Sequence, residues 1–210
     1  MNPYRENAPN LIYGLLFCDD LGIYRSNTQA RDIYPYDILF SKSSTVEDFQ
    51  KIIDDPETET RIKLLAYHLQ RADGHKPSKK ELLAVIIEVG LEDGLDVLAS
   101  YKDGTARYIN HTGSMVIWET KDETSNALTE NLFRNSQVIV NQIGPWDKPR
   151  RPAPATGITR ISFLVSDGLY FGEGPVNVLF NDPMAAPAFQ SGTALMQFLT
   201  EKALNQKKAV

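Results

Sequence analysis

The sequence has little of the side-chain chemistry from which disulfides and metal sites are built. It contains a single cysteine, Cys18, which excludes an internal disulfide and a cysteine-based zinc site. Because Cys18 ends an apolar run, we expect a buried small hydrophobe rather than a nucleophile. No two of the three histidines, His68, His75 and His111, have the spacing of a metal-binding motif. We therefore expect no metal and no cofactor.

Long apolar runs and an excess of positive charge are also missing. No uninterrupted apolar stretch approaches the roughly 20 residues of a membrane helix, and the N-terminus lacks a secretory signal pattern. The net charge is −5, with basic and acidic residues mixed along the chain, which argues against non-specific binding to nucleic acid. We expect a soluble, cytoplasmic protein that binds neither membranes nor nucleic acids.

The composition is that of a folded globular chain. Of its 210 residues 42% are hydrophobic and 23% are charged, which is enough apolar material for a sizeable core. We expect one domain over 1–210, in which the halves 1–144 and 156–210 are joined by a proline-rich strap at 145–155.

The clearest pattern lies in residues 95–119. Asp103-Gly104 stands between two stretches of alternating apolar residues, which is the strongest short-range signal for a β-hairpin. His111-Thr112-Gly113 fits the loop of a second hairpin. The predicted meander has three antiparallel strands, at 95–102, 105–110 and 114–119.

A two-residue turn at Asp103-Gly104 would pair Tyr101 with Ala106, and a three-residue loop ending at Gly113 would then pair Ala106 with Trp118. One face of the meander would carry Val97, Ala99, Tyr101, Tyr108, Val116 and Trp118. The other would carry Leu98, Ser100, Arg107, Ile109, Met115 and Ile117. Both faces are largely apolar, so we expect helices or another subunit to cover both sides.

A second Asp-Gly pair, Asp167-Gly168, predicts another hairpin. Its strands would be 158–166 and 169–174, followed by a short third strand at 176–180. The fold class expected is therefore α+β, with two antiparallel three-stranded meanders, separate or joined into one sheet, covered by helices. The order α-βββ-α-βββ-α suggests a pseudo-repeat, which duplication and coincidence explain equally well.

Helical patterns occupy much of the remaining chain. A capping box at Ser44–Glu47 predicts a helix that ends at Pro56, and a second box at Ser78–Glu81 predicts a helix through Val89. The β-branched residues of that second segment leave a strand as an alternative for its later half. The other expected helices are 57–71, 122–143 and 189–204; the segment 10–19 fits helix or strand, with helix favoured. We expect a loop at 22–36 and a short strand at 36–41.

Arg107 is the one charged residue on its predicted face of the meander. A guanidinium in an apolar environment needs a carboxylate or several acceptors, and Glu88, Asp96 and Glu119 are available. The common interpretation is a structural ion pair or a side chain that reaches solvent. The alternative is a clamp for an anionic ligand, because a guanidinium can bind a carboxylate with two hydrogen bonds.

Two further polar pairs follow from the predicted strand pairings. Arg160 would lie diagonally opposite Glu173, as a cross-strand ion pair, and His111 would face Asp96 across its hairpin. The candidate ligand-binding residues are Arg107, Tyr108, His111 and Arg160.

The strap at 145–155 is rich in proline and must follow an extended path. It could dock on a partner, in which case the candidate interaction residues are Trp146, Pro149, Arg150, Arg151 and Pro152. The alternative is a stiff connector with Trp146 in the core.

No catalytic motif is apparent, so the sequence identifies no catalytic residue and favours a non-enzymatic role without deciding the question. We expect a protein-interaction or assembly module that forms a homodimer and has a possible protein partner. The alternative is a domain that binds or transforms a small anionic molecule in a pocket around the four candidate ligand-binding residues.

Overall fold

The computed structural model describes residues 2–120 and 122–208. Its centre is one antiparallel sheet of six strands in the order β4-β3-β2-β1-β5-β6. The strands are β1 (Leu82–Leu91), β2 (Gly94–Tyr101), β3 (Ala106–Ile109), β4 (Met115–Trp118), β5 (Ile158–Val165) and β6 (Gly168–Pro175).

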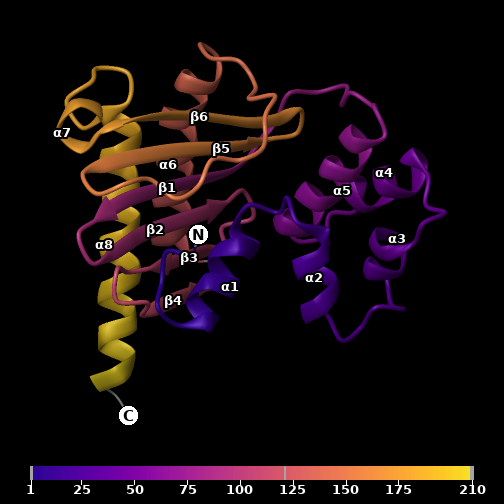
Figure 1. Cartoon of the computed structure of the whole chain (residues 1–210), viewed down its shortest axis with the longest axis horizontal. Helices are drawn as coiled ribbons and strands as arrows, with labels where there is room; N and C mark the ends of the chain where they lie inside the picture. The colour runs from indigo at the N-terminus through magenta and orange to yellow at the C-terminus, as the bar shows by residue number, and fades with distance from the viewer. Residues whose placement is uncertain (1, 121, 209–210) are drawn as a thin grey trace.

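Helices cover both faces of this sheet. The helices of the described residues are α1 (Asn7–Leu16), α2 (Leu21–Asn27), α3 (Tyr36–Phe40), α4 (Val46–Asp54), α5 (Thr60–Ala72), α6 (Glu123–Val140), α7 (Val176–Leu179) and α8 (Ala186–Lys208). The long helices α6 and α8 pack on one face, and α1 lies on the other (Figure 1). The helices α2 to α5 form a lobe beside the sheet. None of the helices in the described ranges has both the length and the apolar character needed to cross a membrane.

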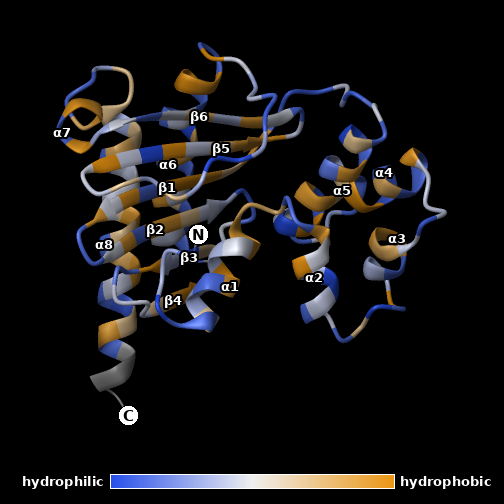
Figure 2. Cartoon of the chain, viewed as in Figure 1, coloured by the Kyte–Doolittle hydropathy of each residue, from blue (hydrophilic) through white to orange (hydrophobic). Residues whose placement is uncertain are grey.

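The sheet separates two apolar cores. Apolar residues run along the central strands, as Figure 2 shows, and alternate residues of each strand point to opposite faces. Ile86, Val97 and Tyr101 pack against the N-terminal helices. Val85, Leu98 and Phe163 pack against α6 and α8. Because both faces are covered, the central strands are apolar on both sides.

The predicted fold class is confirmed. The chain is α+β, and its antiparallel sheet contains two groups of three adjacent strands, β4-β3-β2 and β1-β5-β6, joined through the pairing of β1 with β2.

The helix predicted at 78–89 is wrong, because this segment forms the central strand β1. The capping pattern at Ser78–Glu81 therefore starts no helix. The β-branched run fills a strand that is buried on both faces, where side-chain periodicity gives no distinction from a buried helix. Gly90 is required within β1, since a Cβ there would lie 2.1 Å from the carbonyl oxygen of Ala155 in the strap.

The strands predicted at 176–180 and 36–41 are also wrong. Residues after Pro175 form α7, so β1 supplies the sixth strand, and Tyr36–Phe40 form α3. The predicted loop at 22–36 contains most of α2. The favoured helix at 10–19 is confirmed as α1, and the first capping box lies one residue later than predicted, between Thr45 and Asp48.

The register predicted for the first hairpin is wrong by one residue. The backbone NH of Tyr101 donates to the carbonyl oxygen of Thr105 at 2.9 Å, which closes a three-residue loop with Gly104 at φ +88°. Leu98 therefore pairs with Tyr108. A shift of one residue exchanges the faces, so the predicted grouping of Tyr101 with Tyr108 is wrong.

The pairing of β3 with β4 is confirmed, whereas the register predicted for the second hairpin is wrong by two residues, a shift that leaves the faces unchanged. Ala106 pairs with Trp118, as predicted. In the second hairpin the tight turn begins at Val165, which pairs with Gly168. Arg160 therefore lies directly opposite Glu173 rather than diagonally from it.

Candidate functional site

The strand β4 forms an open edge of the sheet. The backbone NH of Asn110 donates to the carbonyl oxygen of Ser114 at 2.9 Å, which fixes the alternation of the antiparallel ladder. The backbone groups of Val116 therefore face β3, and those of Met115 and Ile117 face outward. The side chains of these two outward residues are 38% and 54% exposed. No charge or proline interrupts β4, although such residues usually protect an edge from pairing.

The opposite edge, β6, is partly closed by the strap. The backbone NH of Trp146 donates to the carbonyl oxygen of Leu169 at 2.6 Å and adds a short bridge to the outer side of β6. Pro175 ends the strand. The two edges of the sheet thus differ. In the part of the chain that the structure describes, the outward backbone groups of the apolar strand β4 have no hydrogen-bond partner.

The helix α8 extends past the β4 edge. Its 23 residues give a length of about 34 Å, whereas six strands span only about 24 Å across the sheet. Figure 1 shows the C-terminal turns of α8 beyond β4. Phe198 anchors the helix on this side, with its ring centre 5.4 Å from that of Trp118. Leu204, one and a half turns later, is 58% exposed.

The predicted ion pair of Arg160 is present and buried. The Nε of Arg160 donates to Glu173 at 2.7 Å, and its Nη1 lies 3.5 Å from a carboxylate oxygen of Glu88. The Nη2 also donates to the carbonyl oxygen of Pro152 at 2.8 Å. Burial raises the pKa of Glu88, and the Tyr13 hydroxyl and Arg160 oppose that shift. Arg160 therefore holds the strap against the sheet and has no free donor pair for a ligand.

The strap is tied down along its length. Arg150 forms a 2.7 Å ion pair with Asp19 and lies 3.9 Å from the ring centre of Phe17. Arg151 pairs with Glu173 at 2.7 Å. These contacts are those of a structural connector between the two halves of the chain. The interaction surface expected on the strap stays a prediction.

Trp146 and Pro149, two of the candidate interaction residues, contact each other within the strap. Trp146 is half-buried, with its ring 5.1 Å from that of Phe171, and therefore is not in the core. The carbonyl oxygen of Pro149 accepts a hydrogen bond from the Trp146 indole nitrogen at 3.1 Å, so Pro149 shapes the strap itself.

The four candidate ligand-binding residues do not converge. Arg107 and Tyr108 are neighbours in β3 and point to opposite faces. Arg107 donates to Glu119 at 2.6 Å, which is the structural ion pair expected for it. Arg160 lies three strands away in β5, about 14 Å across the sheet.

Tyr108 and His111 do share one partner, Asp96. The Tyr108 hydroxyl donates to Asp96 at 3.1 Å, and the backbone NH of His111 donates to its other oxygen at 2.6 Å. The ring nitrogen Nδ1 of His111 is 3.3 Å from the same oxygen. The expected contact of His111 with Asp96 is therefore present at the end of the hairpin, without a catalytic partner beside it.

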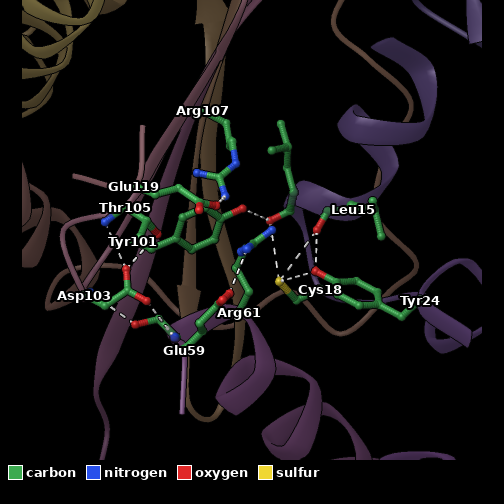
Figure 3. A network of polar contacts seen from close by, with 12 residues as sticks. Leu15, Cys18, Tyr24, Glu59, Arg61, Tyr101, Asp103, Thr105, Arg107 and Glu119 are labelled. Carbon is green, nitrogen blue, oxygen red and sulfur yellow. Dashed lines mark hydrogen bonds and ion pairs between the residues drawn. The ribbon is translucent and has the colours of Figure 1, made fainter. Parts of the chain in front are cut away.

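A second polar network joins the end of α1 and the helical lobe to the sheet (Figure 3). The hydroxyl of Tyr101 donates to the carbonyl oxygen of Leu16 at 2.8 Å. The thiol of Cys18 lies 3.3 Å from the Tyr24 hydroxyl, and burial raises the pKa of Cys18 to about 12. The buried, protonated thiol agrees with the expectation that Cys18 is not a nucleophile.

Asp103, the first residue of the predicted turn, has a further role that the sequence does not indicate. Its carboxylate accepts a 2.8 Å hydrogen bond from the backbone NH of Thr60, at the start of α5 (Figure 3). It also accepts from the backbone NH of Thr105 at 3.0 Å. A residue 43 positions away thus caps the helix, and no local pattern could have revealed it.

A cleft with a volume of about 690 Å³ lies between α5, the end of α1, the turn from β5 to β6 and the strap. Its wall includes His68, Arg71, Lys148 and Trp146. Of these residues the sequence pattern points to Trp146 but to neither Arg71 nor Lys148, because nothing in the local pattern separates the two cations from other surface cations.

Within residues 2–120 and 122–208, no cluster of His, Cys, Asp and Glu has a geometry that could hold a metal ion. In comparisons with known proteins, no family model matches the sequence and no curated protein matches it either.

Proposed function

We propose that this protein is a non-enzymatic assembly module that pairs with a second copy of itself through β4. The observation that carries the proposal is the unprotected edge, where Met115 and Ile117 present both free backbone groups and exposed apolar side chains. Edge strands of this kind favour pairing with another strand, and natural proteins usually block them. Oligomers built from identical chains most often have two-fold symmetry.

The symmetric register that pairs the two outward-facing residues of β4 with each other is centred on Val116. Outward-facing residues must form the hydrogen-bonded pairs, so Met115 would pair with Ile117 of the second copy and Ile117 with its Met115. Val116 would then lie on the two-fold axis, opposite Val116 of the second copy. The two sheets would form one continuous sheet of twelve strands.

The overhang of α8 supports the same arrangement. Its last turns project past β4 on the face that carries α6 and α8. In the paired sheet the two overhangs would pass beside each other and bury Leu204, which is exposed in the single chain. The interface would thus combine backbone hydrogen bonds with an apolar helix contact.

The positions of Arg107, Tyr108, His111 and Arg160 argue against the alternative, a ligand pocket made by these four residues. The buried guanidinium of Arg107 is paired with Glu119, which reaches the surface, and Arg160 is in a buried ion pair with Glu173. Tyr108 lies on the opposite face of the sheet from Arg107.

The test is a cysteine placed on the predicted axis. Opposed residues of a non-hydrogen-bonded antiparallel pair have Cα atoms about 4.5 Å apart, within the range of a disulfide. We expect Val116→Cys to form a covalent dimer on mild oxidation, at a protein concentration where light scattering gives twice the mass of 23.6 kDa. Val138→Cys, an exposed position on α6, is the matched control and should stay monomeric in denaturing gels.

Two results would contradict the proposal. One is a monomeric mass up to high micromolar concentration, which would leave no second copy to pair with. The other is a dimer in which Val138→Cys cross-links as efficiently as Val116→Cys, which would place the interface elsewhere.

A further inference from the structure

The cleft beside the strap contains a half-buried cation, Arg71, that forms no direct ion pair among the described residues. Arg71 donates through Nη1 to the carbonyl oxygen of Ser166 at 2.6 Å. Among the described residues no carboxylate forms an ion pair with Arg71. Burial lowers the pKa of Arg71, and the charge of Asp167 opposes that shift only in part. A buried charge of this kind is unfavourable unless an acceptor compensates for it.

The other charges around the cleft leave this cation available. Asp19 is paired with Arg150, and Asp167 accepts a 2.9 Å hydrogen bond from the Tyr170 hydroxyl, each through one oxygen. The second oxygen of each carboxylate is buried and has no hydrogen-bond partner among the described residues. Asp147, on the strap, is exposed at the rim. The remaining donors on the wall are His68 and Lys148. Lys148 has no ion pair among the described residues and lies 5.5 Å from the ring centre of Trp146.

The rest of the wall is apolar. Phe17, Leu64, Leu164, Leu169 and the ring of Trp146 line the space around Arg71. A volume of about 690 Å³ lies within the usual range of ligand pockets, roughly 300 to 1,000 Å³. A cleft with apolar side chains on part of its wall and two cations that form no ion pair, Arg71 and Lys148, matches a small ring system that bears one carboxylate.

We infer that this cleft binds a small aromatic carboxylate, with Arg71 as the partner of the carboxylate group. Arg71 has further N–H groups besides the one given to Ser166, and a planar carboxylate suits them. Trp146 and Leu169 contact the ring. The site is independent of the proposed assembly, because β4 lies at the opposite edge of the sheet from the turn between β5 and β6.

The probe is 2-naphthoate, with the neutral 2-naphthamide as its isosteric control. Calorimetry on the full chain should show one site that prefers the acid over the amide by about ten-fold or more, since hydrogen bonds to a charged group are the strong ones. In a nitrogen–proton NMR spectrum the Trp146 indole signal should move, while that of Trp118, buried under α8, should not. These two are the only tryptophans in the chain.

Variants then assign the carboxylate partner. Arg71→Gln should reduce naphthoate binding to the level of the amide, whereas Arg134→Gln, at an exposed position on α6, should leave it unchanged. Leu169→Phe, which fills part of the cleft and keeps the guanidinium, should weaken acid and amide alike. This variant remains informative if Arg71→Gln loses the contact to Ser166 and unfolds.

Three results would overturn the inference. They are equal affinity for acid and amide, no binding of naphthoate at millimolar concentration, and naphthoate binding in a folded Arg71→Gln variant that equals that of the unmodified chain.

Discussion

The hydroxyl of Tyr13 donates a 2.6 Å hydrogen bond to the carboxylate of Glu88, across 75 positions of the sequence. Tyr13 belongs to α1, and Glu88 lies fully buried in the central strand β1. The contact holds α1 on its face of the sheet. It also supplies one of the few partners that compensate for the burial of the Glu88 carboxylate, together with Arg160.

Tyr13→Phe should therefore lower the free energy of unfolding by about 1 to 3 kcal/mol, because it leaves a buried acceptor without its donor. Urea unfolding followed by circular dichroism measures the change. Tyr34→Phe is the matched control, since the Tyr34 hydroxyl also donates to a carboxylate, that of Asp55 at 2.8 Å, but at the surface. Equal losses of unfolding free energy in the two variants would show that the burial of the hydrogen bond to Glu88 does not increase its contribution to stability.

Asp103→Asn should lower stability by about 1 kcal/mol at neutral pH, because the carboxylate caps α5 through Thr60. Burial alone would raise the pKa of Asp103, but hydrogen bonds from Thr60 and Thr105 outweigh it and hold the pKa below its ordinary value of 3.8. At acidic pH the native state thus binds fewer protons at Asp103 than the unfolded state does. The stabilisation by the Asp103 carboxylate is therefore fully present above pH 3.8.

The stability difference between Asp103→Asn and the unmodified chain should accordingly shrink as the pH falls below 3.8 and through the folded pKa. Unfolding curves at several pH values between neutral and strongly acidic solution measure it. Asp93→Asn, at an exposed turn between β1 and β2, should show no such trend. A difference that stays constant with pH would mean that the carboxylate charge is irrelevant to the cap.

Ile117→Lys should convert a β4-paired dimer to a monomer without unfolding the chain. The substitution places a charge on the proposed interface, whereas the side chain is 54% exposed in the single chain. Val138→Lys is the matched control, at the same 54% exposure on α6. Light scattering gives the mass of each variant, and a dimer that survives Ile117→Lys while Val138→Lys dissociates would move the interface to α6.

Cys18 should be inert to a thiol reagent in the folded protein and react fully in denaturant. Burial raises its pKa to about 12, so very little of the reactive thiolate forms near neutral pH, and the thiol is also covered. Absorbance on reaction with a disulfide reagent counts the thiols. Rapid labelling of the native chain would contradict both the burial and the protonated state of Cys18.

Features that depend on nearby residues could be predicted from the sequence. The turns at Asp103-Gly104 and Asp167-Gly168, the pairing of Ala106 with Trp118 and the helix α6 all follow from turn residues or periodicity within a short stretch. The fold class follows from these elements, because apolar strands need helices to cover them. The predicted ion pair of Arg160 with Glu173 also follows from one hairpin.

Features that depend on distant residues were decided by the tertiary structure. The segment 82–91 is a strand because it lies at the centre of the sheet, where burial on both faces removes the pattern that identifies a strand. The register at Tyr101 depends on one extra loop residue, which exchanged the predicted faces.

The open edge at β4, the cap of α5 by Asp103 and the cleft around Arg71 all join segments that are far apart in the chain. The sequence by itself determined the local elements, since turn and capping preferences act over a few residues. Only the tertiary structure decided which side chains meet, because burial and strand pairing are settled by the whole packed chain.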